Sequence, residues 1–335
     1  MLSAAKSSLA AVPPFRSRTR SQRFVVFERG DGGALLKRIR ATRQSDIEIV
    51  RVVRLSDNEA ADDLVSELDP RSLIHSRVTG VLVSSAATFD LPAELLLRCR
   101  LAGIRVMSES SFWEEEASQI DIDCRDPGWF LGSRGFRSGR YINVRVRSFD
   151  LLIAVMLLLF TLPVMLIVAL LIKLDSRGPV LYRQERVGRG GRTFTLYKFR
   201  SMTTDAEADG RPCWATIGDP RITRVGMLIR YARIDEVPQL LNVLRGEMSI
   251  IGPRPERPYF VEQLSAAIPF YGARHCVNPG ITGWAQVNAP YGASVEDGRE
   301  KLRFDLYYIK HRSFRLDLLI LLRTIRVVAC GEGAR

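Results

Sequence analysis

An uncharged apolar run, Leu151–Ile172, constrains the fold of this 335-residue chain more than any other feature of the sequence. Its 22 residues are mainly Leu, Val, Ile, Ala and Met. At about 1.5 Å of rise per residue, a helix of this length reaches across the apolar core of a bilayer. The run therefore predicts a membrane-embedded helix over residues 149–174. A helix buried in a soluble core is the alternative, which the basic flanks disfavour.

The flanks and the middle of this run indicate how the helix enters the membrane. Arg145 and Arg147 precede it, and Lys173 and Arg177 follow it. Since cationic flanks favour the cytoplasmic side, both ends are expected on that side. Pro163 removes a helical hydrogen bond near the middle and kinks the chain. We therefore predict a re-entrant helix, broken at this proline; a single spanning helix is the alternative.

Length, charge and cysteine content narrow the class of protein. The length favours two domains. A formal net charge of +12 predicts an anionic partner, which can be a nucleic acid, an acidic lipid surface or a phosphorylated small molecule. The five cysteines are scattered and form no Cys-x-x-Cys pair, so the sequence indicates neither a zinc site nor a disulfide framework. A reducing compartment fits this pattern best.

Ahead of the apolar run, the sequence predicts a basic tail and a small domain. Residues 1–32 are predicted to be a disordered tail, because the first 27 residues carry five cations and no acid; targeting peptides share this composition. From residue 33 to residue 125, β-rich runs alternate with helix-like segments, which predicts an α/β domain with a parallel sheet. The runs are Glu48–Leu55 and Thr79–Ser84, and the helix-like segments are Asn58–Leu68 and Pro92–Ala102.

This α/β domain lacks the usual signature of a dinucleotide site. No Gly-x-Gly-x-x-Gly follows its first predicted strand, so a structural or regulatory role is expected instead of cofactor binding. The glycine-rich stretch Asp126–Gly139 predicts a linker over residues 126–144. A second domain then covers residues 145–335.

After the membrane segment, the sequence predicts a β-hairpin with a basic strand. Alternating apolar and polar residues surround Gly190-Gly191, and the second strand carries Lys198 and Arg200. Because side chains two positions apart share one face of a strand, these two cations are expected to grip a diphosphate together.

An adjacent acid pair, Asp235-Glu236, lies in an arginine-rich segment. Two carboxylates among cations can hold a metal ion and attack a phosphoanhydride, which points to phosphoryl chemistry. The alternative is an ordinary helix N-terminus, where acids are favoured. Farther along, Pro253 and Pro255 lie on either side of Arg254. Because prolines restrict the backbone, they would hold this arginine in a fixed direction, which favours a binding role.

Four motifs together resemble the bacterial sugar transferases that are monotopic polyprenyl-phosphate phosphoglycosyl transferases, of the exopolysaccharide type. They occur in the family's order, and the likeness covers about Arg145–Arg335. The α/β segment before them is similar to part of the Rossmann-like domain of larger members, in complete or incomplete form. The motifs are Lys198–Met202, Ile234–Leu240, Gly252–Pro255 and Asn278–Asn288.

The resemblance implies a reaction and roles for particular residues. In that family a nucleotide-diphosphate sugar, here expected to be a UDP-sugar, gives its sugar-1-phosphate to undecaprenyl phosphate. Asp235 matches the nucleophile, which forms an aspartyl-phosphosugar, and Glu236 matches its partner, a ligand of Mg²⁺. The substrate-binding positions match Lys198, Arg200, Arg254 and Asp305. For Asp305, a surface acid paired with Lys301 is an equal alternative.

The resemblance also implies an α+β catalytic domain with a re-entrant helix at the bacterial inner membrane, facing the cytoplasm. Membrane lipid is an expected partner, nucleic acid is not, and the α/β domain can support a homodimer. The segment Phe314–Ala329 is expected either to lie along the membrane surface or to pack on the catalytic domain. The chain departs from small members at Asn288-Ala289-Pro290, where they carry an arginine. A membrane-anchored module that binds anionic ligands and an inactive scaffold of a polysaccharide assembly complex are the rival functions.

Overall fold

The chain folds into two compact units, residues 1–131 and 132–335, each of which is described by itself. The structure is a computed structural model and describes residues 22–29, 34–41, 47–55, 69–84, 87, 91–122, 135–136, 140–203, 219–289, 292 and 294–329. The division between the units falls inside the segment predicted as a linker, residues 126–144, of which the structure describes residues 135–136 and 140–144; the last five belong to the first helix of unit 2. The predicted helix Asn58–Leu68 lies outside the described residues.

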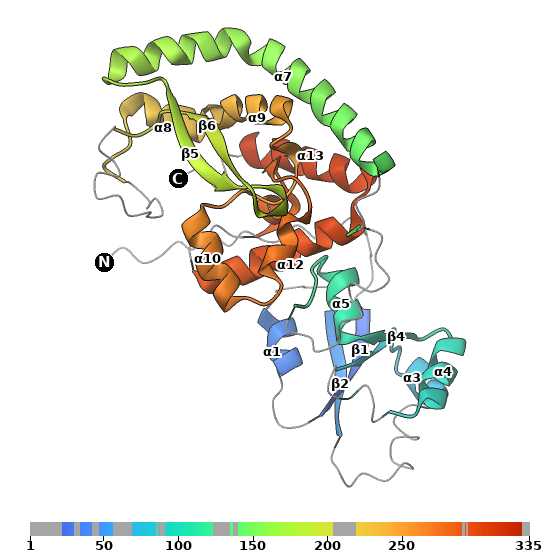
Figure 1. Ribbon diagram of the computed structural model, residues 1–335. Helices are drawn as coiled ribbons and strands as arrows, with labels where there is room; N and C mark the ends of the chain where they lie inside the picture. Colours follow the sequence, from blue (N-terminus) through green and yellow to red (C-terminus); the bar gives the residue numbers. More distant parts are fainter. Residues whose placement is uncertain are drawn as a thin grey trace. The chain divides into compact units, whose positions relative to one another are not determined.

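Unit 1 is a four-stranded parallel sheet with helices on both faces (Figure 1). The strand order is β2-β1-β3-β4, and every neighbouring pair is parallel, so the predicted parallel α/β sheet is confirmed. The elements are β1 Gln22–Arg29, α1 Ala34–Ala41, β2 Ile47–Leu55, α3 Pro70–His75, β3 Gly80–Val83, α4 Ala93–Leu101, β4 Arg105–Ser108 and α5 Glu109–Glu116.

Alternation along β1 builds a separate core on each face of this sheet. Phe24 and Val26 pack with residues of α1 and α5, while Val25 and Phe27 pack with residues of α3 and α4. A strand that is buried on both faces reads as a continuous apolar run, which is typical of central parallel strands.

The predicted domain boundary at residue 33 is wrong, because β1 is an inner strand of the sheet and lies within the segment assigned to the tail. The signal was present in Phe24-Val25-Val26-Phe27, but the arginines before it gave the whole segment the composition of a tail. Residues 1–21 lie outside the described part of the chain.

Unit 2 combines a long apolar helix with a hairpin, a short parallel strand pair and smaller helices (Figure 1). Strands β5 and β6 form the predicted antiparallel hairpin, and β7 pairs with β8 in parallel. The elements are α7 Arg140–Asp175, β5 Leu181–Val187, η1 Arg189–Gly191, β6 Thr193–Phe199, α8 Arg224–Tyr231, η2 Ile234–Gln239, α9 Leu240–Arg245, β7 Ser249–Ile251, α10 Pro258–Ala267, η3 Tyr271–Cys276, β8 Gly280–Thr282, α11 Trp284–Asn288, α12 Val295–His311 and α13 Phe314–Ala329.

Helix α7 is continuous over 36 residues, with Pro163 inside it. The predicted break at this proline is therefore wrong; the helix curves along its length instead (Figure 1). A proline removes one backbone hydrogen bond, and curvature accommodates that loss without ending the helix. Among the described residues, the segment Asn143–Asp175 is the one helix long and apolar enough to cross a membrane.

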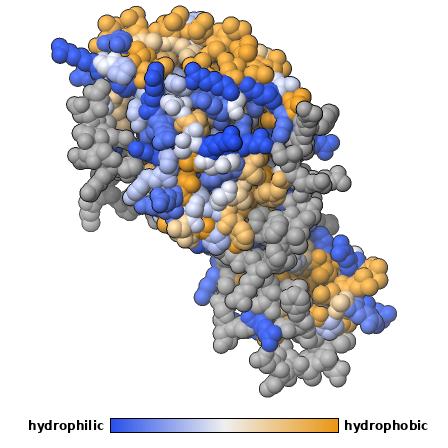
Figure 2. All heavy atoms as spheres, in the orientation of Figure 1, coloured by the Kyte–Doolittle hydropathy of each residue, from blue (hydrophilic) through white to orange (hydrophobic). Residues whose placement is uncertain are grey.

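One face of α7 packs on the rest of unit 2, and the opposite face is apolar and exposed. Asp150, Ala154, Val168 and Ile172 are buried at helical spacing. Leucines, valines and methionines cover the other face, where Phe160 is 83% exposed. Figure 2 shows this face as a continuous hydrophobic surface along the edge of the unit.

Candidate active site

The β5–β6 hairpin presents Lys198 to the acid pair. Gly190 and Gly191 lie at its turn with φ of 68° and 77°, a backbone region that favours glycine. Tyr182 pairs with Lys198 across the hairpin, one residue before β6 ends at Phe199. The hairpin thus sets the position from which the ammonium group reaches residues 235 and 236.

A left-handed residue turns the chain into the acid pair. Helix α8 ends at Tyr231, and Arg233 then adopts φ 58° and ψ 16° before η2 begins. Asp235 and Glu236 occupy the first turn of η2, so the alternative of a helix N-terminus correctly describes their local structure. Both side chains are nevertheless buried, unlike ordinary surface acids at a helix start.

Asn242 fixes η2 and α9 to the hairpin. Its side chain is fully buried, accepts from the Tyr197 backbone N–H at 3.2 Å and donates to the Thr195 carbonyl at 2.7 Å. The amide also donates to Glu247 at 2.7 Å. These bonds hold the strand that carries Lys198 against the segment that carries the acids.

Two of the predicted site residues, Lys198 and Arg254, converge on Glu236. Lys198 Nζ donates to Glu236 Oε1 at 2.7 Å, and Arg254 Nη2 donates to the same oxygen at 2.9 Å. Lys198 Nζ also lies 4.0 Å from Asp235 Oδ2. Within the described part of the chain, no hydrogen bond engages the Asp235 carboxylate, so both of its oxygens are available to a substrate.

The two neighbouring acids have pKa values shifted in opposite directions. Burial raises the pKa of Asp235, and this effect outweighs the attraction of Lys198. Burial alone would also raise the pKa of Glu236, but Arg254 and Lys198 hold it well below its usual range. Glu236 is therefore a fixed negative charge, while Asp235 is a less stabilised and more reactive carboxylate.

The loop that carries Arg254 is packed backbone to backbone against a second motif. A Cβ on Gly280 would lie 2.0 Å from the Gly252 nitrogen, so no side chain fits there. The Gly252 N–H donates to the Thr282 carbonyl, and the Gly280 N–H donates to the Pro253 carbonyl, both at 2.9 Å. The Gly252–Pro255 and Asn278–Asn288 motifs thus form one rigid support for Arg254.

Asp305 supports this loop from behind. It is fully buried, and its Oδ2 accepts from Arg274 Nη2 at 2.7 Å and from Arg274 Nε at 3.1 Å. Arg274 Nη2 also donates to the Arg254 carbonyl at 3.0 Å. Burial raises the pKa of Asp305 to about 6, although Arg274 favours the charged form. The alternative of a surface acid paired with Lys301 is wrong, because Asp305 is buried and its ion pair is with Arg274.

Arg200 does not join the cluster, which corrects the prediction from strand alternation. Its Nη2 donates to the Ser176 carbonyl at 2.7 Å and to the Ile172 carbonyl at 3.3 Å, at the end of α7. Alternation fails because β6 ends at Phe199, one residue earlier. Arg200 therefore caps α7, while Lys198 reaches the acids.

The residues present suit a magnesium ion that arrives with a phosphate substrate. Glu236 Oε1 is occupied by two cations, which leaves Glu236 Oε2 and the Asp235 oxygens as ligands. Within the described ranges, no group of three or more His, Cys, Asp or Glu is placed to hold a metal ion. Mg²⁺ commonly uses one or two carboxylates together with substrate phosphates and waters, so the donor set fits.

Two contributors to this site carry no sequence signal. Arg274 has no motif that predicts its burial against Asp305, and Arg147 of α7 caps α9 by donating to the Leu244 carbonyl at 2.7 Å. Both act through contacts between residues far apart in the chain. Two cysteines that the structure describes, Cys99 and Cys276, form no disulfide.

Comparisons with known proteins show which family this chain resembles in sequence. A family model described as bacterial sugar transferase matches residues 141–331. The chain is 48% identical over 249 residues to the UDP-N-acetylgalactosamine-undecaprenyl-phosphate N-acetylgalactosaminephosphotransferase of Aeromonas hydrophila, covering 73% of this chain and 58% of the relative. It is 49% identical over 185 residues to the undecaprenyl-phosphate glucose phosphotransferase of Komagataeibacter xylinus, covering 54% of this chain and 35% of that relative.

A third relative is shorter. The UDP-glucose:undecaprenyl-phosphate glucose-1-phosphate transferase of Caulobacter vibrioides is 45% identical over 196 residues, which are 58% of this chain and 73% of that protein. The matched family region spans more than half of the chain and contains Lys198, Asp235, Glu236 and Arg254. The chain therefore belongs to the bacterial sugar transferase family.

Proposed function

We propose that this protein transfers a sugar-1-phosphate from a UDP-sugar to undecaprenyl phosphate and so initiates assembly of an exopolysaccharide or another glycoconjugate. The observation that carries the proposal is the buried acid pair, with Glu236 fixed by Lys198 and Arg254 and Asp235 left open. The matched relatives are named for transfers of this kind, with N-acetylgalactosamine or glucose as the sugar. The chain spans 58% of the first of these relatives and 35% of the second.

In the first step, an Asp235 carboxylate oxygen attacks the phosphorus that bears the sugar. The bond from that phosphorus to the bridging oxygen breaks, and UMP leaves with the electron pair. Lys198 and Arg254, which lie beside the acid pair, would neutralise charge on the diphosphate. The sugar phosphate is then held as an acyl phosphate on Asp235.

In the second step, a phosphate oxygen of undecaprenyl phosphate attacks the same phosphorus. The bond to Asp235 breaks, and the carboxylate takes back its electron pair, ready for another cycle. Burial of Asp235 limits the access of water, which would otherwise hydrolyse the acyl phosphate. A Mg²⁺ ion held by Glu236, with Asp235 nearby, would supply further neutralisation of the diphosphate.

We also propose that α7 is re-entrant, that the catalytic unit lies on the cytoplasmic face of the inner membrane, and that unit 1 is Rossmann-like. Supporting the first point, contacts tie both ends of α7 to unit 2. Ser249 and Ile250 donate to Asp150 near its start, and Val225 donates to Asp175 at its end. Supporting the last point, unit 1 has an all-parallel sheet with helices on both faces, as Rossmann-like domains do; its strand order, β2-β1-β3-β4, is the 2-1-3-4 order of the flavodoxin-like relatives of that fold.

The proposal is tested by UMP release from the full chain in detergent with Mg²⁺, undecaprenyl phosphate and a panel of UDP-sugars. UDP-N-acetylgalactosamine and UDP-glucose come first, because the relatives are named for these donors. Asp235→Asn is expected to reduce turnover by about a thousandfold or more, since it removes the nucleophile. The control is Glu262→Gln, which removes an exposed acid on α10 and should retain full activity.

A second measurement tests the covalent step. With donor and no acceptor, intact-mass spectrometry should detect one added sugar phosphate on the wild-type chain and none on Asp235→Asn. Full turnover in Asp235→Asn would overturn the assigned nucleophile. Absence of release with every donor, while the protein still associates with lipid, would favour the binding-module or scaffold function.

A further inference from the structure

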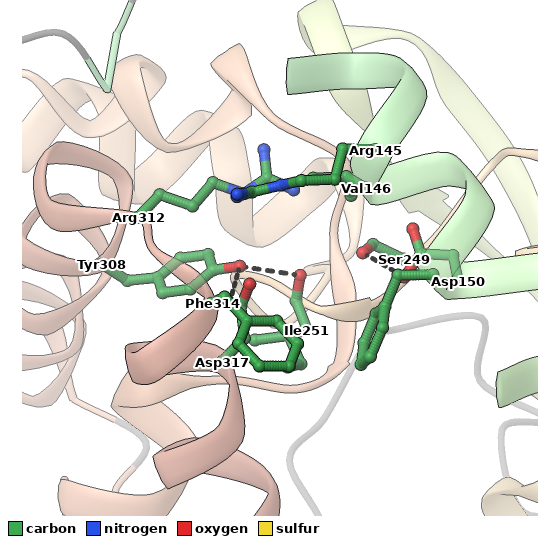
Figure 3. A pocket seen from close by; sticks show the side chains of 10 residues that line it. Arg145, Val146, Asp150, Ser249, Ile251, Tyr308, Arg312, Phe314 and Asp317 are labelled. Atoms are coloured by element: carbon green, nitrogen blue, oxygen red, sulfur yellow. Dashed lines mark hydrogen bonds between the residues drawn. The ribbon is translucent and has the colours of Figure 1, made fainter. Parts of the chain in front are cut away.

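A cavity of about 270 Å³ lies near the start of α7 (Figure 3). The candidate active-site residues Lys198, Asp235, Glu236 and Arg254 do not line it. Its walls come from α7, from β7 and from the junction of α12 with α13. The phosphoryl chemistry proposed above makes no use of it.

The body of this cavity is apolar and aromatic. Val146, Phe149, Ile251 and Phe314 line it. The rings of Phe149 and Phe314 meet edge to face, with centroids 6.4 Å apart and planes at 87°. This contact joins α7, just ahead of its apolar run, to the first residue of α13, so the two rings together form an apolar wall against which a hydrocarbon chain can pack.

Two arginines form one side of the cavity. Arg145 and Arg312 lie on the same side in Figure 3, above the ring of Tyr308. Arg312 stacks on that ring at 6.0 Å, and its Nε is buried without a hydrogen-bond partner. No carboxylate in the described part of the chain forms an ion pair with either guanidinium within 4.0 Å.

The two acids of the cavity are engaged by protein donors. Asp150 Oδ1 accepts from Ser249 Oγ and from the Ile250 N–H, both at 2.9 Å. Asp317 Oδ1 accepts from the Tyr308 hydroxyl at 3.0 Å. Arg312 attracts both carboxylates and hydrogen-bonds Tyr308, and Arg145 attracts Asp317, so an anion that enters from outside would bind the remaining donors of the two guanidinium groups.

The position of the cavity indicates what kind of anion enters. The exposed apolar face of α7 starts at Leu151, directly after Asp150, and α13 exposes Phe314, Leu318 and Leu322 along one side. The cavity thus lies where two apolar surfaces begin, with cations beside an apolar interior. This arrangement complements an amphiphile that carries a phosphate next to a hydrocarbon chain.

We propose that this cavity binds one anionic phospholipid of the bilayer, with its phosphate between Arg145 and Arg312 and the first part of an acyl chain against Phe149 and Phe314. The bound lipid fastens the junction of α7 and α13 to the membrane. It is distinct from the acceptor, whose phosphate must reach the phosphorus held at Asp235, because Asp235, Glu236, Lys198 and Arg254 do not line the cavity.

The test is native mass spectrometry of the full chain in mild detergent with phosphatidylglycerol or phosphatidylcholine of identical acyl chains. Wild type should retain one phosphatidylglycerol about tenfold more than phosphatidylcholine, because charge-assisted hydrogen bonds favour the net anionic lipid. The Arg145→Gln/Arg312→Gln variant should lose that preference. Val146→Trp, which fills the cavity without changing its charge, should reduce retention of both lipids.

The matched control is Arg315→Gln, which removes an exposed arginine of α13 that does not line the cavity and should bind as wild type does. Thermal melting of each variant separates lost binding from lost folding. Unchanged preference in the double arginine variant would overturn the proposal. Competitive displacement of phosphatidylglycerol by undecaprenyl phosphate would also overturn it, since the cavity would then belong to the acceptor. The readout is binding, so it is independent of whether transfer occurs.

Discussion

Asp235 and Glu236 are adjacent in the chain but meet different surroundings. Glu236 accepts from both Lys198 and Arg254, whereas Asp235 lies 4.0 Å from the lysine and accepts no hydrogen bond from any described residue. Carboxylates whose surroundings push their pKa values apart commonly divide a chemical task. In the mechanism that we propose, one acid organises the cations and the other attacks phosphorus.

The raised pKa of Asp235 predicts how the rate of phosphosugar-enzyme formation depends on pH at the acidic end of the range. Only the ionised carboxylate is a nucleophile, so the rate of phosphosugar-enzyme formation rises with pH through its pKa. Because burial raises that pKa, the midpoint should lie above the ordinary aspartate value of about 3.9. Rapid-quench measurement of the covalent intermediate between pH 4 and pH 8 checks this expectation.

Asp305, with a pKa raised by burial to about 6, is a second group that titrates in this range. The Asp305→Asn variant has no ionisable group at position 305. If its residual rate still rises with pH over the same range, that rise is due to the ionisation of Asp235. If the rise in rate disappears in this variant, the rise is due to the ionisation of Asp305 in its pair with Arg274.

Lys198 and Arg200 show how far strand periodicity predicts a site. Both were expected on one face, and the hairpin itself is confirmed, but β6 ends between them. The hairpin pattern and its glycines are local properties of the sequence. The residue at which a strand ends depends on packing against α7, which lies elsewhere in the chain.

At the scale of elements, the support for Arg254 depends on contact between two backbones. We predict that Gly280→Ala destabilises unit 2 by about 1–3 kcal/mol, because its Cβ would overlap the Gly252 nitrogen and push the two loops apart. Activity should fall more than stability alone accounts for, since Arg254 would move away from Glu236. Thermal melting and UMP release from the same preparation check both effects.

Gly272→Ala is the matched control for this substitution. A Cβ on Gly272 meets nothing within 4 Å, so stability and activity should stay near the wild-type values. Equal behaviour of the two variants would show that the close approach of Gly252 and Gly280 does not position Arg254.

Helices and strands were predicted correctly where the hydrophobic pattern of the segment itself indicates them. One strand was missed where the charge of the surrounding residues indicated a disordered tail. The segment Phe314–Ala329 forms α13 with the predicted bounds, and the run Glu48–Leu55 lies within β2. Strand β1 was missed, although Phe24–Phe27 is a continuous apolar run, because surrounding arginines outweighed it. The absence of a dinucleotide fingerprint persists with β1 as the first strand, since Leu35 occupies the third glycine position after Gly30 and Gly32.

For unit 2 as a whole, the contacts of α7 limit how the protein can meet a membrane. Arg147 and Asp150 bind α9 and β7 near one end of the helix, while Arg200 and Val225 bind its other end. A bilayer cannot pass between a helix and a domain that hold each other at both ends. The exposed apolar face can therefore enter the membrane from one side only.

This geometry predicts the labelling pattern of single cysteines in sealed inverted vesicles, with the five native cysteines replaced by serine. Val144→Cys and Arg177→Cys, exposed positions on either side of the apolar run, should both react with an impermeant maleimide added outside. Phe160→Cys, in the middle of the exposed apolar face, should react only after detergent is added. Protection of one flanking cysteine but not the other would mean that α7 spans the bilayer, and its contacts with unit 2 would then have to break at one end.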